Sequence, residues 1–430
     1  MPATRLVKRE RAILVGLCLG RGDRLPLDEH LAELGRLAET AGAEVVGCLV
    51  QERGRTSPST LVRSGKVEEL KSLATKGKAN LVVFDEDLSP AQVKNLEESL
   101  GLKVLDRSAL ILDIFARRAR TREARTQVEL AQLRYLLPRL TRQWGHLSRQ
   151  EGGIGQRGVG ETQLEIDRRM IRRRIARLVE ELKDIVKERC ERRKTRRSEP
   201  RVALIGYTNA GKSTIMRLLT GAEVFVEDRL FATLDPLVRR CERGGHPPLL
   251  VIDTVGFIRK LPHHLVASFR STLEEAGEAD LLVEVIDASS PAIEDHLRTT
   301  RETLADLGLA DRPLLRLFNK IDLAPAGVLE RLEGDYPGAI LISALDPSQA
   351  DRLEESVRAA LGGPLVEETM SIPAGATGIL TRLGGAIKVI QSAWVDGRLE
   401  VRFRARPSDL ARMSQLLRAA AAAGGEETAS

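Results

Sequence analysis

Cysteine is scarce in this chain, and the few cysteines are not arranged for cross-linking or metal binding. The 430 residues include four of them, Cys18, Cys48, Cys190 and Cys241, with no C-x-x-C pair and no histidine at zinc-ligand spacing. The sequence therefore supports neither a disulfide framework nor a structural zinc site. We expect a cytoplasmic protein.

Long apolar runs are also missing. The longest, residues 12–20, is far short of the roughly 20 residues that cross a bilayer. Because no small-residue cleavage site follows this run, we interpret it as a buried strand rather than a signal peptide. The sequence predicts no transmembrane helix and leaves open only a peripheral position at a membrane.

Aromatic side chains make up 3% of the chain, too few for base stacking to be the main contact with a nucleic acid. Positive charge, by contrast, is concentrated. Residues 116–197 hold 24 basic and 11 acidic side chains, a net charge of +13, whereas the whole chain carries +6. Such a block is typical of a protein that binds a phosphate backbone, and folded RNA or a duplex fits it best. A solvated helix surface is the alternative, and an acidic membrane is a weaker one because no apolar face accompanies the arginines.

The chain is long enough for two to four domains. Its patterns predict an α/β protein with four parts, at residues 1–115, 116–198, 199–362 and 363–430. The first part alternates predicted strands at 13–17, 44–50, 81–84 and 103–105 with predicted helices near 27–41, 65–76, 89–100 and 107–118. This alternation favours a parallel sheet with helices on its faces.

The basic segment 116–198 is predicted to form a long antiparallel helical hairpin. Apolar residues recur at helical spacing in two series, from Leu130 to Leu147 and from Leu164 to Ile185. Pro138 should kink the first arm. The joining segment 152–160 contains G-x-G-x-x-G, but no strand precedes it, so a dinucleotide site is rejected. Its bare backbone would allow close approach to a ligand backbone, and a flexible connector is the alternative.

The last part, residues 363–430, is predicted to be a small α+β domain with a disordered tail. Two strand-like runs, 386–394 and 399–405, flank Asp396 and Gly397, which together signal a hairpin turn. A helix should follow from Pro407 to about residue 423.

A phosphate-binding loop follows the predicted strand 202–205. Residues 206–213 read G-x-x-x-x-G-K-S, in which the backbone N–H groups wrap phosphate, Lys212 reaches the β and γ phosphates, and the Ser213 hydroxyl binds Mg²⁺. The expected nucleotide-binding residues here are Gly206, Asn209, Ala210, Gly211, Lys212, Ser213 and Thr214.

Two further elements should complete the phosphate end of the site. Asp253 ends a predicted strand and is followed by Gly256, whose N–H would sense the γ phosphate, and Thr233 lies between the two loops, where a first switch would supply a hydroxyl. We expect Ser213, Thr233 and Asp253 to hold Mg²⁺, and Lys212, Thr233 and Gly256 to be catalytic.

The base-binding end is predicted at two later strand ends. Asp322, in the run Asn319-Lys320-Ile321-Asp322, can accept hydrogen bonds from guanine N1 and N2, which adenine cannot offer. Ser343 and Ala344 should close the base pocket. Five such elements in order at strand ends predict a GTPase.

Hydrolysis by this site should be slow on its own. Phe257 follows Gly256 at the place where a water-orienting glutamine would stand, and an apolar side chain cannot position water. A partner or an ion is then needed. Asn209 is a candidate ligand for K⁺, with a cap on the loop backbone as the equally weighted alternative.

At this point the sequence resembles the HflX family of translational GTPases. The resemblance lies in residues 152–169 (GGIGQRGVGETQLEIDRR), 231–236, 253–257 and 269–276, with Leu261-Pro262 and the early Lys66-Val67-Glu68-Glu69-Leu70. It implies a monomeric cytosolic protein that binds the rRNA of the large ribosomal subunit through the N-terminal domain and hairpin. It also implies splitting or rescue of stalled ribosomes under stress.

Two other classes of function stay open from the sequence. One is an RNA-binding module for ribosome assembly, in which GTP is only an occupancy sensor. The other is a GTP-regulated partner of a membrane or protease complex, with no RNA.

Overall fold

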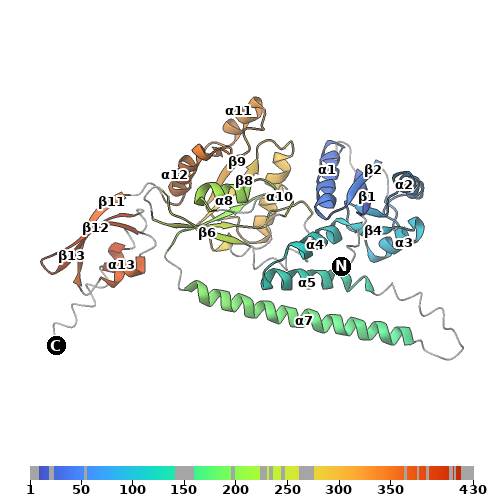
Figure 1. Cartoon of the computed structure of the whole chain (residues 1–430), viewed down its shortest axis with the longest axis horizontal. Helices are drawn as coiled ribbons and strands as arrows, with labels where there is room; N and C mark the ends of the chain where they lie inside the picture. The colour runs from blue at the N-terminus through green and yellow to red at the C-terminus, as the bar shows by residue number, and fades with distance from the viewer. Residues whose placement is uncertain are drawn as a thin grey trace, which may run out of the picture. The chain divides into compact units, whose positions relative to one another are not determined.

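The computed structural model describes residues 9–18, 24–52, 56–140, 159–194, 199–222, 230–231, 236–243, 247–260, 276–362, 366–374, 377–383, 387–405, 410 and 413–417. The chain forms two compact units (Figure 1). Unit 1 comprises Met1–Val186 together with the short segments Asp228–Leu234 and Lys260–Arg270, and unit 2 comprises Lys187–Glu227, Asp235–Arg259 and Ser271–Ser430.

Unit 1 begins with a parallel sheet in the strand order β2-β1-β3-β4. The strands are β1 (Arg11–Cys18), β2 (Glu44–Glu52), β3 (Leu81–Phe84) and β4 (Lys103–Asp106), and they alternate with α1 (Arg24–Thr40), α2 (Ser64–Gly77), α3 (Pro90–Leu100) and α4 (Arg107–Arg118). Because β1 and β3 are central and are covered on both faces, they are apolar along nearly their whole length. The predicted α/β arrangement is confirmed.

Local signals set the ends of these helices. Ser89 and Gln92 form a capping box at the start of α3, and the Asp106 carboxylate accepts the Ala109 N–H at the start of α4. Asp106 is fully buried, and it also accepts hydrogen bonds from the Tyr135 hydroxyl at 2.8 Å and the Arg139 guanidinium at 2.9 Å. The carboxyl end of β4 is thereby tied to the helical part of unit 1.

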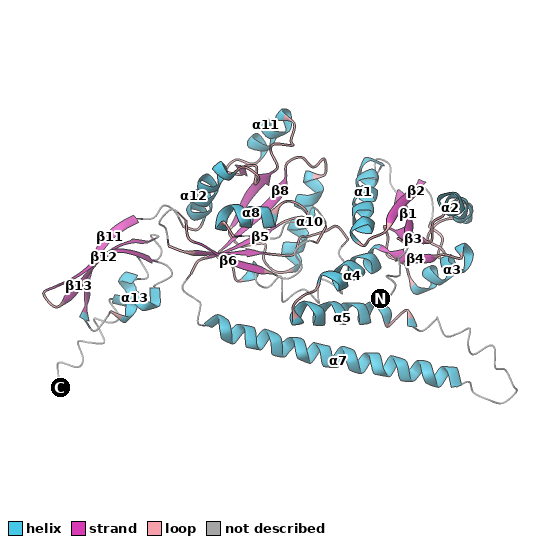
Figure 2. Cartoon of the chain, in the orientation of Figure 1, coloured by secondary structure: helices cyan, strands magenta, loops and turns pink. Residues whose placement is uncertain are grey.

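The helical part consists of α5 (Arg122–Leu136) and α7 (Val159–Lys194), drawn as helices in Figure 2. Two ion pairs join them, Arg122 with Glu181 at 2.9 Å and Arg174 with Glu129 at 2.7 Å. Since the residue numbers rise on one helix as they fall on the other, the two helices are antiparallel, as predicted. The first arm is interrupted at Pro138, as expected: α5 ends at Leu136, residues 137–139 form a turn, and residue 140 is helical again. The glycine-rich segment 152–158 falls outside the described residues.

Unit 2 contains a larger sheet in the order β10-β9-β8-β5-β7-β6, parallel except for β6. Its strands are β5 (Arg201–Ile205), β6 (Leu237–Cys241), β7 (Leu249–Asp253), β8 (Leu281–Asp287), β9 (Leu314–Asn319) and β10 (Ile340–Leu341). Four described helices accompany them, α8 (Lys212–Thr220), α10 (Ile293–Asp306), α11 (Ala326–Asp335) and α12 (Ala350–Ala360). The central strand β5 is buried, so the loop that follows it begins from a strand packed in the core.

A small antiparallel sheet, β11-β13-β12, completes unit 2. It comprises β11 (Val366–Pro373), β12 (Ile387–Val395) and β13 (Arg398–Ala405), with the short helix α13 (Gly378–Leu383). Asp396 and Gly397 both have positive φ, 48° and 75°, which confirms the predicted hairpin turn. The sequence patterns predict neither β11 nor α13. Of the helix expected from Pro407, only residues 410 and 413–417 are described, and they are helical.

Candidate functional site

The loop between β5 and α8 has a backbone that only glycine can adopt at two positions. Gly206 has φ +133°, and a Cβ there would stand 2.2 Å from the Val285 carbonyl oxygen of β8. Gly211 has φ +95°, and a Cβ would stand 2.2 Å from the Asn319 side-chain nitrogen. These close approaches fold the loop tightly over the end of β5, a conformation that suits a phosphate-binding loop.

Lys212 is held inside this loop. It is 7% exposed, and its Nζ donates hydrogen bonds to the carbonyl oxygens of Gly206 at 3.1 Å and Tyr207 at 2.8 Å. Burial lowers the pKa of the ammonium to about 8, while the charge of Asp253 opposes the decrease. The loop thus holds a desolvated cation that a phosphate would stabilise.

The predicted metal ligands come together in part. The Ser213 hydroxyl, at the start of α8, donates to Asp253 Oδ2 at the end of β7 over 2.6 Å. A hydroxyl and a carboxylate oxygen are hard donors of the kind that Mg²⁺ prefers, so these residues fit the ion, which would neutralise phosphate charge. Thr233 lies outside the described residues.

The chain after β7 lies against the phosphate loop. A Cβ on Gly256 would stand 2.8 Å from Thr208 Cα and 2.9 Å from Lys212 Nζ, so only glycine fits next to this lysine. The next residue, Phe257, is 2% exposed and packs in a core cluster with Ile205. Its side chain is therefore directed into the protein, consistent with the expectation that it does not position water.

The base-binding loops are tied to the phosphate loop through Asn319. Its amide nitrogen donates to the Ala210 carbonyl at 2.9 Å and its oxygen accepts the Ala344 N–H at 2.9 Å. Lys320, with φ +63°, pairs with Asp287 at 2.7 Å. Asn319 thus braces three loops, whereas the carboxylate of Asp322 is exposed and available to a base.

The structure brings together most of the predicted nucleotide residues. Direct contacts or close approaches join Ser213 to Asp253, Gly256 to Lys212, and Asn319 to Ala210, Gly211 and Ala344. Thr214 is buried in α8, Asn209 has φ +62°, and Ser343 precedes Ala344 in the base-side loop.

Comparison with known proteins agrees with this geometry. Residues 28–116 match the family model described as GTP-binding GTPase N-terminal, residues 118–196 the one described as GTP-binding GTPase Middle Region, and residues 201–320 the one described as 50S ribosome-binding GTPase. A protein named GTPase HflX from Caldanaerobacter subterraneus subsp. tengcongensis is 48% identical over 355 residues, which cover 82% of this chain and 81% of that protein. This chain belongs to the HflX family of GTPases.

Other members of the HflX family match over nearly their full length. Those from Gluconacetobacter diazotrophicus and Escherichia coli are 40% and 39% identical, covering 95% and 92% of this chain and 98% and 93% of their own. The chain is therefore a P-loop GTPase, an enzyme that hydrolyses GTP. Among the described helices none has both the length and the apolar content needed to cross a membrane.

In this HflX-family chain, unit 1 includes two short segments that flank the nucleotide motifs in sequence. Phe231, five residues before Pro236, packs edge-on against Phe115 of α4 with ring centroids 4.6 Å apart. Lys260, four residues after Gly256, pairs with Asp85 at 2.9 Å and Glu86 at 2.6 Å. Phe231 and Lys260 therefore both contact the parallel-sheet part of unit 1.

The basic helix α7 presents its arginines in two ways. Arg174 is held by Glu129, whereas Arg169, Arg172, Arg173 and Arg177 are exposed and have no carboxylate partner within the described residues. The second group is accessible to an external anion.

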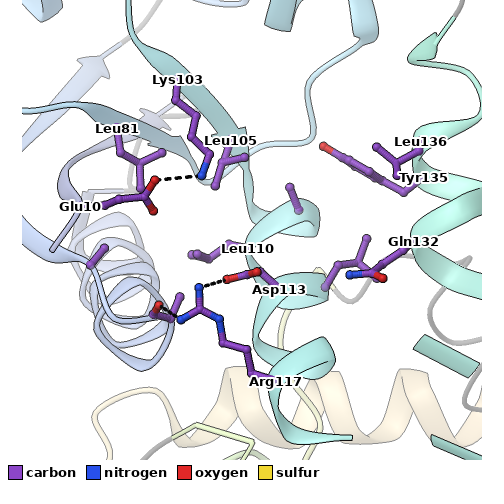
Figure 3. A pocket seen from close by; sticks show the side chains of 14 residues that line it. Glu10, Leu81, Lys103, Leu105, Leu110, Asp113, Arg117, Gln132, Tyr135 and Leu136 are labelled. Carbon is purple, nitrogen blue, oxygen red and sulfur yellow. Dashed lines mark hydrogen bonds and ion pairs between the residues drawn. The ribbon is translucent and has the colours of Figure 1, made fainter. Parts of the chain in front are cut away.

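A pocket of about 380 Å³ lies in unit 1 between the sheet, α4 and α5 (Figure 3). Leu110 and other apolar side chains line it. Two ion pairs also line the pocket, Lys103 with Glu10 at 3.0 Å and Arg117 with Asp113 at 2.8 Å.

Sequence reasoning missed two residues of the nucleotide site and the role of a third. Tyr207 occupies a position that the loop motif leaves open, and Asp287 was not connected with Lys320. The bracing role of Asn319 was also missed. Only the pairing of Asp287 could have been predicted from the sequence. An acidic residue at the end of a buried strand suggests a basic partner at the same edge of the sheet.

Proposed function

We propose that this GTPase binds the large ribosomal subunit through rRNA phosphates and couples GTP binding and hydrolysis to the splitting or rescue of stalled ribosomes under stress. The observation that carries the proposal is the set of exposed arginines on α7 without carboxylate partners in the described part of the chain, Arg169, Arg172, Arg173 and Arg177. The match of residues 201–320 to a 50S ribosome-binding GTPase model supports it. The chain acts as a cytoplasmic monomer, with the four parts bounded at residues 115, 198 and 362.

The nucleotide site works with Mg²⁺ in this proposal. Ser213, Asp253 and Thr233 hold the ion, and Lys212 and Gly256 contact the γ phosphate. Asn209 takes part in a K⁺ site beside the phosphates. Asp322 selects guanine, with Lys320, Ser343 and Ala344 around the base.

One observation favours a second function. Phe257 is buried in the core and offers no group to orient water, so nucleotide occupancy alone could act as the signal. The chain would then be an RNA-binding assembly module in which GTP is a sensor.

Gradient sedimentation with ribosomes and with isolated large subunits separates these functions. With a non-hydrolysable GTP analogue we expect co-sedimentation with large subunits and loss of intact ribosomes, and weaker binding with GDP. Binding to large subunits that leaves intact ribosomes unchanged would favour the assembly module. No binding in either nucleotide state would contradict both.

A further inference from the structure

Three hydrogen bonds, each donated by a backbone N–H, join the start of the second switch, residues 255–259, to the phosphate loop. The Phe257 N–H donates to the Gly206 carbonyl at 3.0 Å, and the Thr208 N–H donates to the Phe257 carbonyl at 2.7 Å. The third bond differs in kind, because the Arg259 N–H donates to the Tyr207 hydroxyl at 2.9 Å. One side chain of the loop therefore fixes the last residue of this segment.

The Tyr207 ring is itself held from outside the loop. It is 6% exposed and stacks on His296 of α10, with ring centroids 3.8 Å apart and planes 16° from parallel. A stacked aromatic ring keeps few rotamers. The hydroxyl is therefore presented to Arg259 at a position set by α10.

The hydrogen bonds to the phosphate loop, together with the stacked Tyr207 ring, restrict the position of Gly256. The chain before it is held in β7, which ends at Asp253, and the chain after it is held by the bonds of Phe257 and Arg259. A Cβ on Gly256 would stand 2.8 Å from Thr208 Cα and 2.9 Å from Lys212 Nζ. A donor that is already in place stabilises charge developing on the γ phosphate without reorganisation.

Phosphate binding does not require a tyrosine at position 207, because the loop contacts phosphate through its backbone and Lys212. We propose that Tyr207 is a positioning residue for GTP hydrolysis, that it acts through Arg259 on Gly256, and that His296 orients it. The proposal concerns the hydrolytic reaction and does not depend on ribosome binding.

The test is single-turnover hydrolysis of saturating GTP by the full-length chain with Mg²⁺, beside the Kd for GDP. Tyr207→Phe keeps the ring and removes the acceptor of the Arg259 N–H. We expect the hydrolysis rate to fall about 5- to 20-fold, the effect of losing one hydrogen bond that organises the transition state, with the Kd for GDP changed less than about twofold. The preference for a non-hydrolysable GTP analogue over GDP should fall as well.

The matched control is Tyr336→Phe, which removes a hydroxyl bonded to Glu294 on the same helix α10 but away from the loop. It should hydrolyse GTP at the wild-type rate. An unchanged or raised rate in Tyr207→Phe would overturn the proposal, as would a loss of GDP affinity as large as the loss of rate, since the tyrosine would then only support the loop.

His296 is tested by combination. His296→Ala should lower the rate on its own and have little further effect when added to Tyr207→Phe, because both changes remove the same interaction. Effects that multiply would show that His296 does not act through the Tyr207 hydroxyl and would overturn that part of the proposal.

Discussion

At the scale of single residues, the nucleotide site depends on three backbone positions that leave no room for a side chain. Gly206, Gly211 and Gly256 each lie where a Cβ would come within 3 Å of another atom. The close packing excludes water from Lys212 and accounts for its low pKa.

This pKa gives a prediction about pH. Phosphate binds the charged form of Lys212, so the pKa rises when nucleotide binds, and above pH 8 binding must take up a proton. The affinity for GDP should be constant below about pH 7.5 and should fall as pH rises above 8, by at most about tenfold per pH unit. Titration calorimetry between pH 7 and 9 measures this. In Lys212→Ala the weaker binding should lose that slope, and the same slope in the variant would assign it to another group.

Selection of guanine is predicted to depend on one residue, Asp322. Asp322→Asn replaces an acceptor of guanine N1–H by a donor, so GDP affinity should fall at least about 100-fold while xanthosine diphosphate binding improves. Competition between the two nucleotides measures the change. Asp346→Asn is the control, because that carboxylate accepts hydrogen bonds from Ser348 and Gln349 beside the pocket. Unchanged GDP affinity in Asp322→Asn would show that the base is read elsewhere.

At the scale of elements, the hairpin helices α5 and α7 combine a packing face with an open basic face. Leu178 is buried, whereas the neighbouring Arg173 and Arg177 are exposed. The apolar stripe of α7 therefore packs on the protein, and its arginines remain in solvent.

Exposure of the arginines predicts a salt dependence. The combined change Arg172→Ala, Arg173→Ala and Arg177→Ala should reduce the slope of log affinity for ribosomes against log salt by about one for each arginine that binds a phosphate. GTP binding should not change. Binding is measured at several salt concentrations, and Lys183→Ala, which removes a cation already paired with Glu180 on the same helix, is the control. An unchanged slope would mean that the arginines only solvate the helix.

Sequence patterns predicted the buried elements well and the exposed ones poorly. The strand at 81–84 was predicted with its observed limits, because parallel strands covered on both faces are continuously apolar. β11 was missed because most of its residues are exposed and polar, such as Glu367 and Thr369. The stacking of Tyr207 on His296 could not be predicted, since it depends on α10 folding back to the loop.

At the scale of the whole molecule, the two segments Asp228–Leu234 and Lys260–Arg270 belong to unit 1 although they lie next to nucleotide motifs in sequence. Lys260 is only four residues from Gly256, a reach of at most about 14 Å. The covalent link between Gly256 of unit 2 and Lys260 of unit 1 is therefore short.

The intact protein should hydrolyse GTP slowly by itself and faster with large ribosomal subunits, because Phe257 cannot position water and the missing group comes from the partner. Phosphate release with and without subunits, in K⁺ and in Na⁺, measures this. A rate in buffer that subunits do not raise would contradict activation by a partner. Equal rates in the two salts would contradict only the K⁺ role of Asn209.

The two ion pairs of the hairpin lie seven residues apart on each helix, Arg122 and Glu129 on α5 and Arg174 and Glu181 on α7. A seven-residue slip of one helix along the other preserves the facing sides of both, so apolar packing alone would tolerate it. The charges do not. Slipped one way, Arg122 meets Arg174 and Glu129 meets Asp167; slipped the other way, Glu129 meets Glu181 while Arg122 meets Glu188. The first slip therefore brings two like-charged pairs together, and the second keeps one attraction against one repulsion, so only the observed register lets both pairs attract.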